Sequence, residues 1–112
     1  MKDDLAYIEH ILDAISRIKK YTDGLSYDEF TSSDMSQDAV IRNFEIIGEA
    51  AKNISTELIL SNPKIPWKEM AGMRDKLIHD YMGVDISVIW KTCQEDVLQL
   101  ESLLNNTFFP KT

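Results

Sequence analysis

One run of apolar residues constrains the fold of this 112-residue chain more than any other feature. The run advances by steps of 4, 3, 4, 3 and 4 residues, and it consists of Val40, Phe44, Ile47, Ala51, Ile54 and Leu58. Such spacing is the seam of a helix that packs against other helices at a shallow angle. Asp34, followed three residues later by Gln37, is typical of an N-cap with a reach-back partner. The sequence therefore predicts a helix of roughly 22 residues, about 33 Å long.

A second amphipathic helix is predicted over residues 3–21, where apolar side chains recur at steps of three and four. Its apolar face comprises Leu5, Ile8, Ile11, Leu12, Ile15 and Ile18. Asp23 and Gly24 end this helix. We interpret residues 25–33 as a packed loop that Tyr27 and Phe30 pin onto the core.

The second half of the chain predicts two further helices. Pro66 suits the first turn of a helix that begins near Trp67 and runs to about Tyr81. Gly83 ends that helix, and Asp85 can cap the next one. The apolar stripe of this last helix consists of Ile86, Ile89, Trp90, Cys93, Val97, Leu100 and Leu104. The short connections predict an all-α, antiparallel bundle of four to five helices in a single domain, residues 1–112.

Composition narrows the classes of function. The net charge of −7 comes from 19 acidic against 12 basic residues, and it argues against broad electrostatic binding to nucleic acid or anionic lipid. Any contact with nucleic acid must be local. A single cysteine excludes an internal disulfide, and neither a signal peptide nor a membrane helix is recognisable, so we expect a cytoplasmic protein.

Metal and cofactor chemistry are not indicated. The chain has two histidines, His10 and His79, and neither follows a glutamate by three residues as in the metal sites of helical bundles. A site made of carboxylates alone stays formally open. Cys93 lies on an apolar stripe and is interpreted as a buried structural thiol, and His10 as a solvated helix residue. Phosphate-loop and nucleophile-elbow motifs are absent from the sequence.

Ionisable residues concentrate between Met73 and Gly83. On a regular helix Arg74 and Tyr81 share a face, and Asp75 pairs with His79 at i, i+4. Arg74 and His79, however, lie about 140° apart on such a helix. They converge only if the helix ends near His79 or if a two-fold partner supplies the other half of the site, which leads us to expect a homodimer.

This region resembles a known family. The pattern Arg74-x4-His79-x-Tyr81, preceded by the segment Ile-Ile-Gly-Glu-Ala-Ala at residues 46–51, is similar to that of the HepT-type HEPN domain family, and the similarity covers essentially the whole chain. The resemblance implies a dimeric bundle whose paired Arg and His line an interface cleft. It also implies a metal-independent endoribonuclease that needs no cofactor and serves as a toxin beside a minimal nucleotidyltransferase antitoxin. RNA, such as tRNA or mRNA, is then the substrate, and neither DNA nor a membrane is expected as a partner.

Carried over by position, the resemblance assigns catalysis to Arg74 and His79 and places AMP, transferred by the antitoxin, on Tyr81. Asp75 occupies a polar position where relatives most often have Asn. The residue chemistry agrees, because RNA brings its own 2′-hydroxyl nucleophile and needs only a base near neutral pKa and a cation for the phosphate. Glu49 is a candidate partner of Arg74, in a structural or a supporting role.

Non-catalytic interpretations of the same residues stay open at this point. Asp75 and His79 also fit an ordinary surface pair, and Tyr81 fits a capping aromatic over Gly83. The main alternative function is a non-catalytic module that binds a nucleotide or substrate and partners a nucleotidyltransferase. A purely structural helical adaptor is the third candidate.

Overall fold

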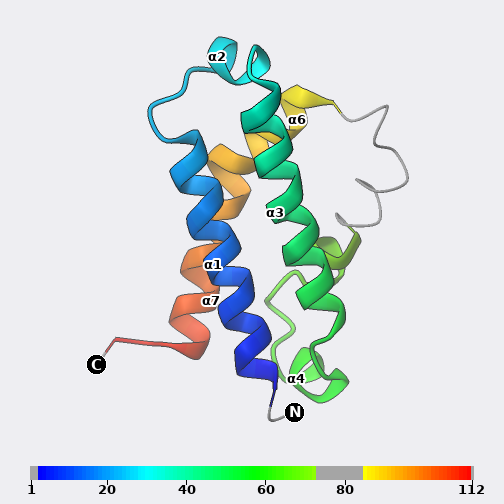
Figure 1. Cartoon of the computed structure of the whole chain (residues 1–112). Coiled ribbons are helices and arrows are strands. Elements are labelled where there is room, and N and C mark those ends of the chain that lie inside the picture. Colours follow the sequence, from blue (N-terminus) through cyan, green and yellow to red (C-terminus); the bar gives the residue numbers. More distant parts are fainter. Residues whose placement is uncertain (1–2, 73–84, 112) are drawn as a thin grey trace.

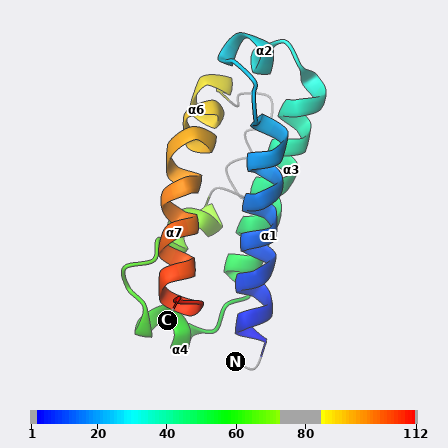
Figure 2. The same cartoon turned by 90° about the vertical axis from the view of Figure 1, so that its left-hand side faces the viewer.

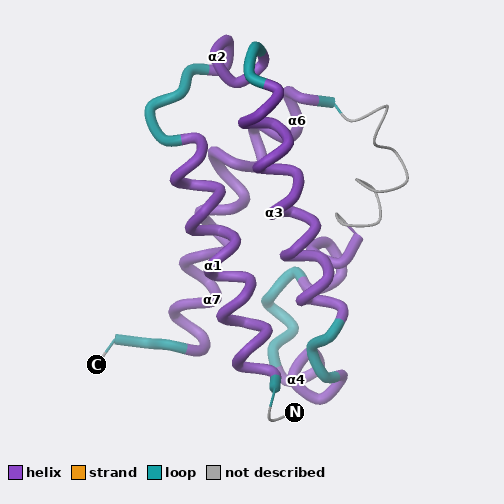
Figure 3. The backbone as a smooth tube through the Cα atoms, in the orientation of Figure 1, coloured by secondary structure: helices purple, strands orange, loops and turns teal. Residues whose placement is uncertain are grey.

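The computed structural model describes residues 3–72 and 85–111, and these residues form helices and connecting turns without any strand. The helical elements are α1 (Asp4–Thr22), α2 (Tyr27–Thr31), α3 (Asp34–Lys52), α4 (Thr56–Ser61), residues 67–72, α6 (Ile86–Lys91), the π-helical turn η2 (Thr92–Asp96) and α7 (Val97–Phe108). Figure 3 shows the helices in purple along most of the described backbone. The all-α prediction is therefore confirmed for this part of the chain.

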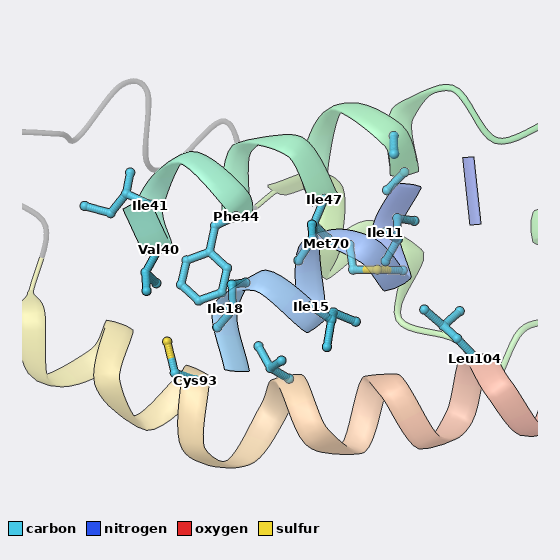
Figure 4. Close-up of a cluster of buried hydrophobic side chains, with 14 of the residues drawn as sticks. Ile11, Ile15, Ile18, Val40, Ile41, Phe44, Ile47, Met70, Cys93 and Leu104 are labelled. Carbon is cyan, nitrogen blue, oxygen red and sulfur yellow. The ribbon is translucent and has the colours of Figure 1, made fainter. Parts of the chain in front are cut away.

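Three long elements lie side by side. α1 and α3 run in opposite directions, and α6, η2 and α7 follow one another as a rod that packs against α1 (Figures 1 and 2). Between them lies one apolar core, whose side chains include Ile11, Ile15 and Ile18 of α1, Phe44 and Ile47 of α3, and Leu104 of α7. Figure 4 shows the Phe44 ring extending from α3 toward Ile18. The predicted seam of α3 is confirmed, since Val40, Phe44, Ile47, Ala51 and Ile54 are all buried.

The predicted end of α1 is also confirmed. Asp23 follows the helix in an extended conformation, and Gly24 turns the chain with φ of +76°, a conformation that favours glycine. The prediction is wrong for one residue of the apolar face, because Leu5 is 51% exposed. It lies in the first turn of α1, at the end of the bundle.

Residues 25–33 are not wholly a loop, which corrects the prediction. They contain α2, which begins with a reciprocal capping box in which Ser26 and Glu29 each accept a hydrogen bond from the other's backbone N–H. Phe30 is fully buried, as expected, and its ring lies 5.1 Å from that of Trp90. Tyr27 is 42% exposed and contacts the edge of Trp90. The aromatic contacts thus hold α2 against α6.

The start of α3 differs by one residue from the prediction. Ser33, rather than Asp34, is the N-cap, and its hydroxyl accepts a hydrogen bond from the backbone N–H of Ser36. The Gln37 side chain does not reach back to the cap. It donates to the carbonyls of Phe30 and Thr31 and so ties α2 to α3.

The predicted long helix ends early. α3 stops at Lys52, and α4 begins anew with Ser55 as its N-cap. The apolar spacing continues through Ile54, which is buried, so the core contacts persist although the helix does not. Asp4 of α1 holds the backbone N–H of Ser55 at 2.9 Å, which commits that group to a contact outside the helix.

The helix predicted near Trp67 begins there. Trp67 is buried, and its indole N–H donates to the Asn62 carbonyl at 3.0 Å. Asp85 caps α6 as predicted, through hydrogen bonds from the backbone and hydroxyl of Ser87. The last predicted helix contains the π turn η2, which its apolar stripe did not indicate. Ile89, Cys93 and Val97 are buried at steps of four, slightly more than one α-helical turn, and the wider turn keeps all three on the core side.

Candidate functional site

The two predicted catalytic residues, one supporting residue and the predicted modification site lie outside the described part of the chain. Arg74, Asp75, His79 and Tyr81 all fall within residues 73–84. Glu49 is the described member of the predicted set, and it lies exposed in the last turn of α3. The neighbourhood of Glu49 is therefore where the described structure bears on a site.

Glu49 lines a pocket of about 350 Å³ between α1 and α3. Its backbone carbonyl accepts a hydrogen bond at 2.8 Å from the side chain of Asn53, the C-cap residue of α3. Asn53 lines the same pocket, and so do Arg42 and Glu45. These four residues follow one another at steps of 3, 4 and 4, which places them on a single face of α3.

α1 supplies the opposite wall of the pocket with Tyr7 and His10. Their rings meet edge to face, with centroids 6.1 Å apart and planes at 87°. Tyr7 is half-buried, whereas His10 is exposed, as predicted for a solvated helix residue. Ile46 and Ala50 of α3 complete the lining with apolar surface.

A partly buried polar link also joins the two helices that form the pocket. The Arg17 Nε of α1 donates to Asn43 Oδ1 at 2.8 Å, and Asn43 Nδ2 donates to the Ala39 carbonyl at 2.8 Å. Asn43 is only 4% exposed, so its amide requires these partners. The link fixes the register of α1 on α3 and thereby the spacing of the two pocket walls.

The pocket brings charged, amide and aromatic side chains together. Within residues 3–72 and 85–111, no group of three or more His, Cys, Asp or Glu side chains could hold a metal ion. The pocket combines two carboxylates, one guanidinium, an amide and two aromatic rings. Sequence reasoning missed Tyr7, His10, Arg42 and Glu45 as site residues, although the 42, 45, 49, 53 spacing was a signal that could have found the α3 wall.

Cys93 is confirmed as a buried thiol. It is 3% exposed, and burial raises its pKa to about 12. At neutral pH the group is therefore protonated and enclosed, which suits packing rather than nucleophilic chemistry. Figure 4 shows it in the core, near Val40 and Phe44.

A second hollow of about 420 Å³ lies between α3, residues 64–70 and the last helices. Its lining is mainly apolar and includes Ile47, Met70, Leu100 and Leu103, with Lys64 and Glu69 also present. Glu49 does not line it.

Within the described residues, no helix combines the length and the hydropathy that crossing a bilayer requires.

Comparison with known proteins identifies the family. The sequence signature of the family described as "Ribonuclease HepT-like" matches residues 11–107. A relative from Thermococcus cleftensis, named "Probable ribonuclease HepT", is 50% identical over 95 residues, which cover 85% of this chain and 86% of the relative. A relative from Caldanaerobacter subterraneus, named "Putative RNase TTE0752", is 43% identical over 101 residues, which cover 90% of each chain. No solved structure matches the chain significantly. The chain belongs to the HepT-like ribonuclease family.

Proposed function

We propose that this protein is a metal-independent endoribonuclease that acts in the cytoplasm as the toxin of a toxin-antitoxin system. The family match over residues 11–107 carries the proposal, and this range includes Arg74, His79 and Tyr81, the residues on which the resemblance to the family rests. The names of two relatives, both given as ribonucleases, support RNA as the substrate.

The proposed reaction uses the nucleophile that RNA carries. The His79 imidazole takes the proton of a 2′-hydroxyl, whose oxygen attacks the adjacent phosphorus. The bond from phosphorus to the 5′-oxygen breaks, and a protonated imidazole returns a proton to that oxygen. Arg74 neutralises the charge that builds on the phosphate oxygens. The products are a 2′,3′-cyclic phosphate and a 5′-hydroxyl, and no metal ion takes part.

A homodimer completes this scheme. Arg74 and His79 lie about 140° apart on a regular helix, so a two-fold partner can supply the half of the site that one protomer cannot. His79 of the partner subunit then serves as the general acid. We propose that Asp75, four residues before His79 in the sequence, and Glu49, which is exposed on α3, are supporting carboxylates that orient the imidazole and the guanidinium.

Neutralisation is proposed to occur at Tyr81. A minimal nucleotidyltransferase antitoxin transfers AMP to the phenol, and the added bulk and negative charge occupy the place of the substrate phosphate. Incubation with that antitoxin and ATP should add the mass of one AMP to the wild-type chain and none to Tyr81→Phe. An unmodified wild-type chain would refute this part of the proposal.

The ribonuclease activity is tested by incubating a tRNA pool with the purified protein in excess EDTA. Wild type should cleave, whereas His79→Ala and Arg74→Ala should each lose activity by at least about a hundredfold. Lys91→Ala, which removes an exposed cation from α6, is the matched control and should cleave as wild type does. Intact RNA with wild type, in protein shown by mass to be unmodified, would favour the non-catalytic binding module.

A further inference from the structure

The pocket between α1 and α3 holds groups that the proposed hydrolysis does not use. Arg42, Glu45 and Asn53 belong to no step of that reaction, yet they line one wall together with Glu49. Across from them, Tyr7 and His10 form an aromatic wall, and Arg17 and Asn43 hold the two helices in register. A surface built from two helices in this way is suited to binding a ligand.

Charge limits what the pocket accepts. Its lining has one guanidinium, that of Arg42, beside the carboxylates of Glu45 and Glu49, so a free phosphate has a single cation to bind and is not favoured. A metal ion is not favoured either, since the described residues provide no cluster of three metal-binding side chains. The ligand that fits is an uncharged group rich in hydrogen-bond donors, with an anion attached at the Arg42 end.

Shape limits the ligand further. The Tyr7 ring and the apolar surface of Ile46 and Ala50 offer a surface to a planar group. A volume of about 350 Å³ falls at the small end of the range for ligand pockets and suits a single nucleotide unit. Unpaired RNA bases are recognised in this way, by stacking on aromatic side chains and by hydrogen bonds to the Watson–Crick edge.

We propose that this pocket is a base-recognition subsite that selects guanine in single-stranded RNA. Glu45 accepts hydrogen bonds from the N1–H and the 2-amino group, the base stacks on Tyr7, and Arg42 binds the flanking phosphate. Guanine presents two adjacent donors to the carboxylate, adenine and cytosine present an amino group, and uracil presents one N–H between two carbonyls. This inference rests on the proposed function in taking RNA as the substrate.

The test measures binding rather than cleavage. Short RNA strands with 2′-O-methyl groups lack the nucleophile, so the wild-type protein can be titrated with them without cleavage. A series that differs only at one central base, namely guanine, hypoxanthine, adenine, cytosine or uracil, is followed by fluorescence anisotropy. We expect the guanine strand to bind about tenfold more tightly than the uracil strand, with hypoxanthine, which lacks the 2-amino group, in between.

Substitutions at Glu45 and Tyr7 locate the preference. Glu45→Gln should bind all five strands alike, whereas Glu95→Gln, an exposed glutamate of η2 away from the pocket, should keep the wild-type preference. Tyr7→Ala should lower the affinity for every RNA strand. Tyr7→Phe should bind the strands as wild type does, because the aromatic ring remains. Equal affinity of wild type for all bases, or a guanine preference that survives Glu45→Gln, would overturn the assignment.

Failure of this inference is distinguishable from failure of the proposed function. Cleavage in EDTA without base preference in the binding series would retain the ribonuclease and overturn the subsite. Guanine-selective binding that Glu45→Gln abolishes, without cleavage of any RNA, would support the subsite and refute the enzyme.

Discussion

Removal of the Asp4 carboxylate should lower the stability of the protein, because this group joins the first turn of α1 to the start of α4. Oδ1 of Asp4 accepts a hydrogen bond from the Ser55 backbone N–H at 2.9 Å, and Oδ2 accepts one from the Ser55 hydroxyl at 2.6 Å. The same hydroxyl accepts from the Leu58 N–H at 3.1 Å and so caps α4. Asp4 is 8% exposed, and it joins the first turn of α1 to a helix start 51 residues later.

The size of the effect follows from these two contacts. A single hydrogen bond to a charged group contributes about 1.5–3 kcal/mol to stability. Because one side chain at the edge of the core makes both bonds, we expect their combined contribution to lie near the low end of this range. We therefore expect Asp4→Ala to lower the free energy of unfolding by about 2 kcal/mol, or about 8 °C in melting temperature for a chain of this length. Asp4→Asn keeps one acceptor and should lose about half as much.

The stability contribution of Asp4 should depend on pH. The hydrogen bond from the Ser55 hydroxyl, together with that from the Ser55 backbone, lowers the pKa of Asp4 in the folded protein despite partial desolvation. The folded state therefore binds this proton less readily than the unfolded chain does. The contribution is fully present above the unfolded pKa of about 3.9 and is lost as pH falls through the lower, folded value.

The assay is thermal and urea unfolding followed by circular dichroism, from neutral pH down into the acid range. Asp13→Asn removes an exposed carboxylate of α1 and serves as the control, with little expected effect. An Asp4→Ala variant as stable as Asp13→Asn would refute the reasoning. So would a difference between wild type and Asp4→Asn that grows, rather than shrinks, in acid.

Three further predictions concern two buried side chains and one surface salt bridge. Phe44→Ala empties a site that is 1% exposed at the centre of the core, so urea unfolding should show a loss of about 3–5 kcal/mol, and a loss below about 1 kcal/mol would contradict the packing. Cys93, with a pKa raised to about 12, should react with a thiol reagent at neutral pH only after denaturation, and rapid stoichiometric labelling of the native protein would count against its burial. Lys19→Ala breaks a 2.9 Å salt bridge to Glu101 between partly exposed side chains, so its cost, measured by melting in low and high salt, should stay below about 1 kcal/mol.

The core was predictable from the sequence because its periodicity is local information. Val40, Phe44 and Ile47 are buried where the seam places them, and Phe30 anchors the segment before α3 as expected. The end of α3 was not predictable in the same way. The apolar spacing continues to Leu58, but the helix restarts at Ser55, whose N–H is held by Asp4 from the other end of the sequence.

The π turn escaped prediction for a different reason. A stripe at steps of four fits an α-helix closely over a few residues, and only the accumulated drift over Ile89, Cys93 and Val97 calls for a wider turn. The pocket was harder still to predict from the sequence. Tyr7 and His10 belong to one helix and Arg42 and Glu45 to another, so their meeting depends on how α1 packs on α3.

The chemical ends of the RNA fragments test the central claim most directly. Wild-type protein in excess EDTA is incubated with a tRNA pool, and the fragment termini are identified by mass spectrometry. The proposed mechanism predicts 2′,3′-cyclic phosphates and 5′-hydroxyls, which His79→Ala does not produce. Cleavage that requires a divalent ion and leaves 3′-hydroxyl and 5′-phosphate ends would contradict it.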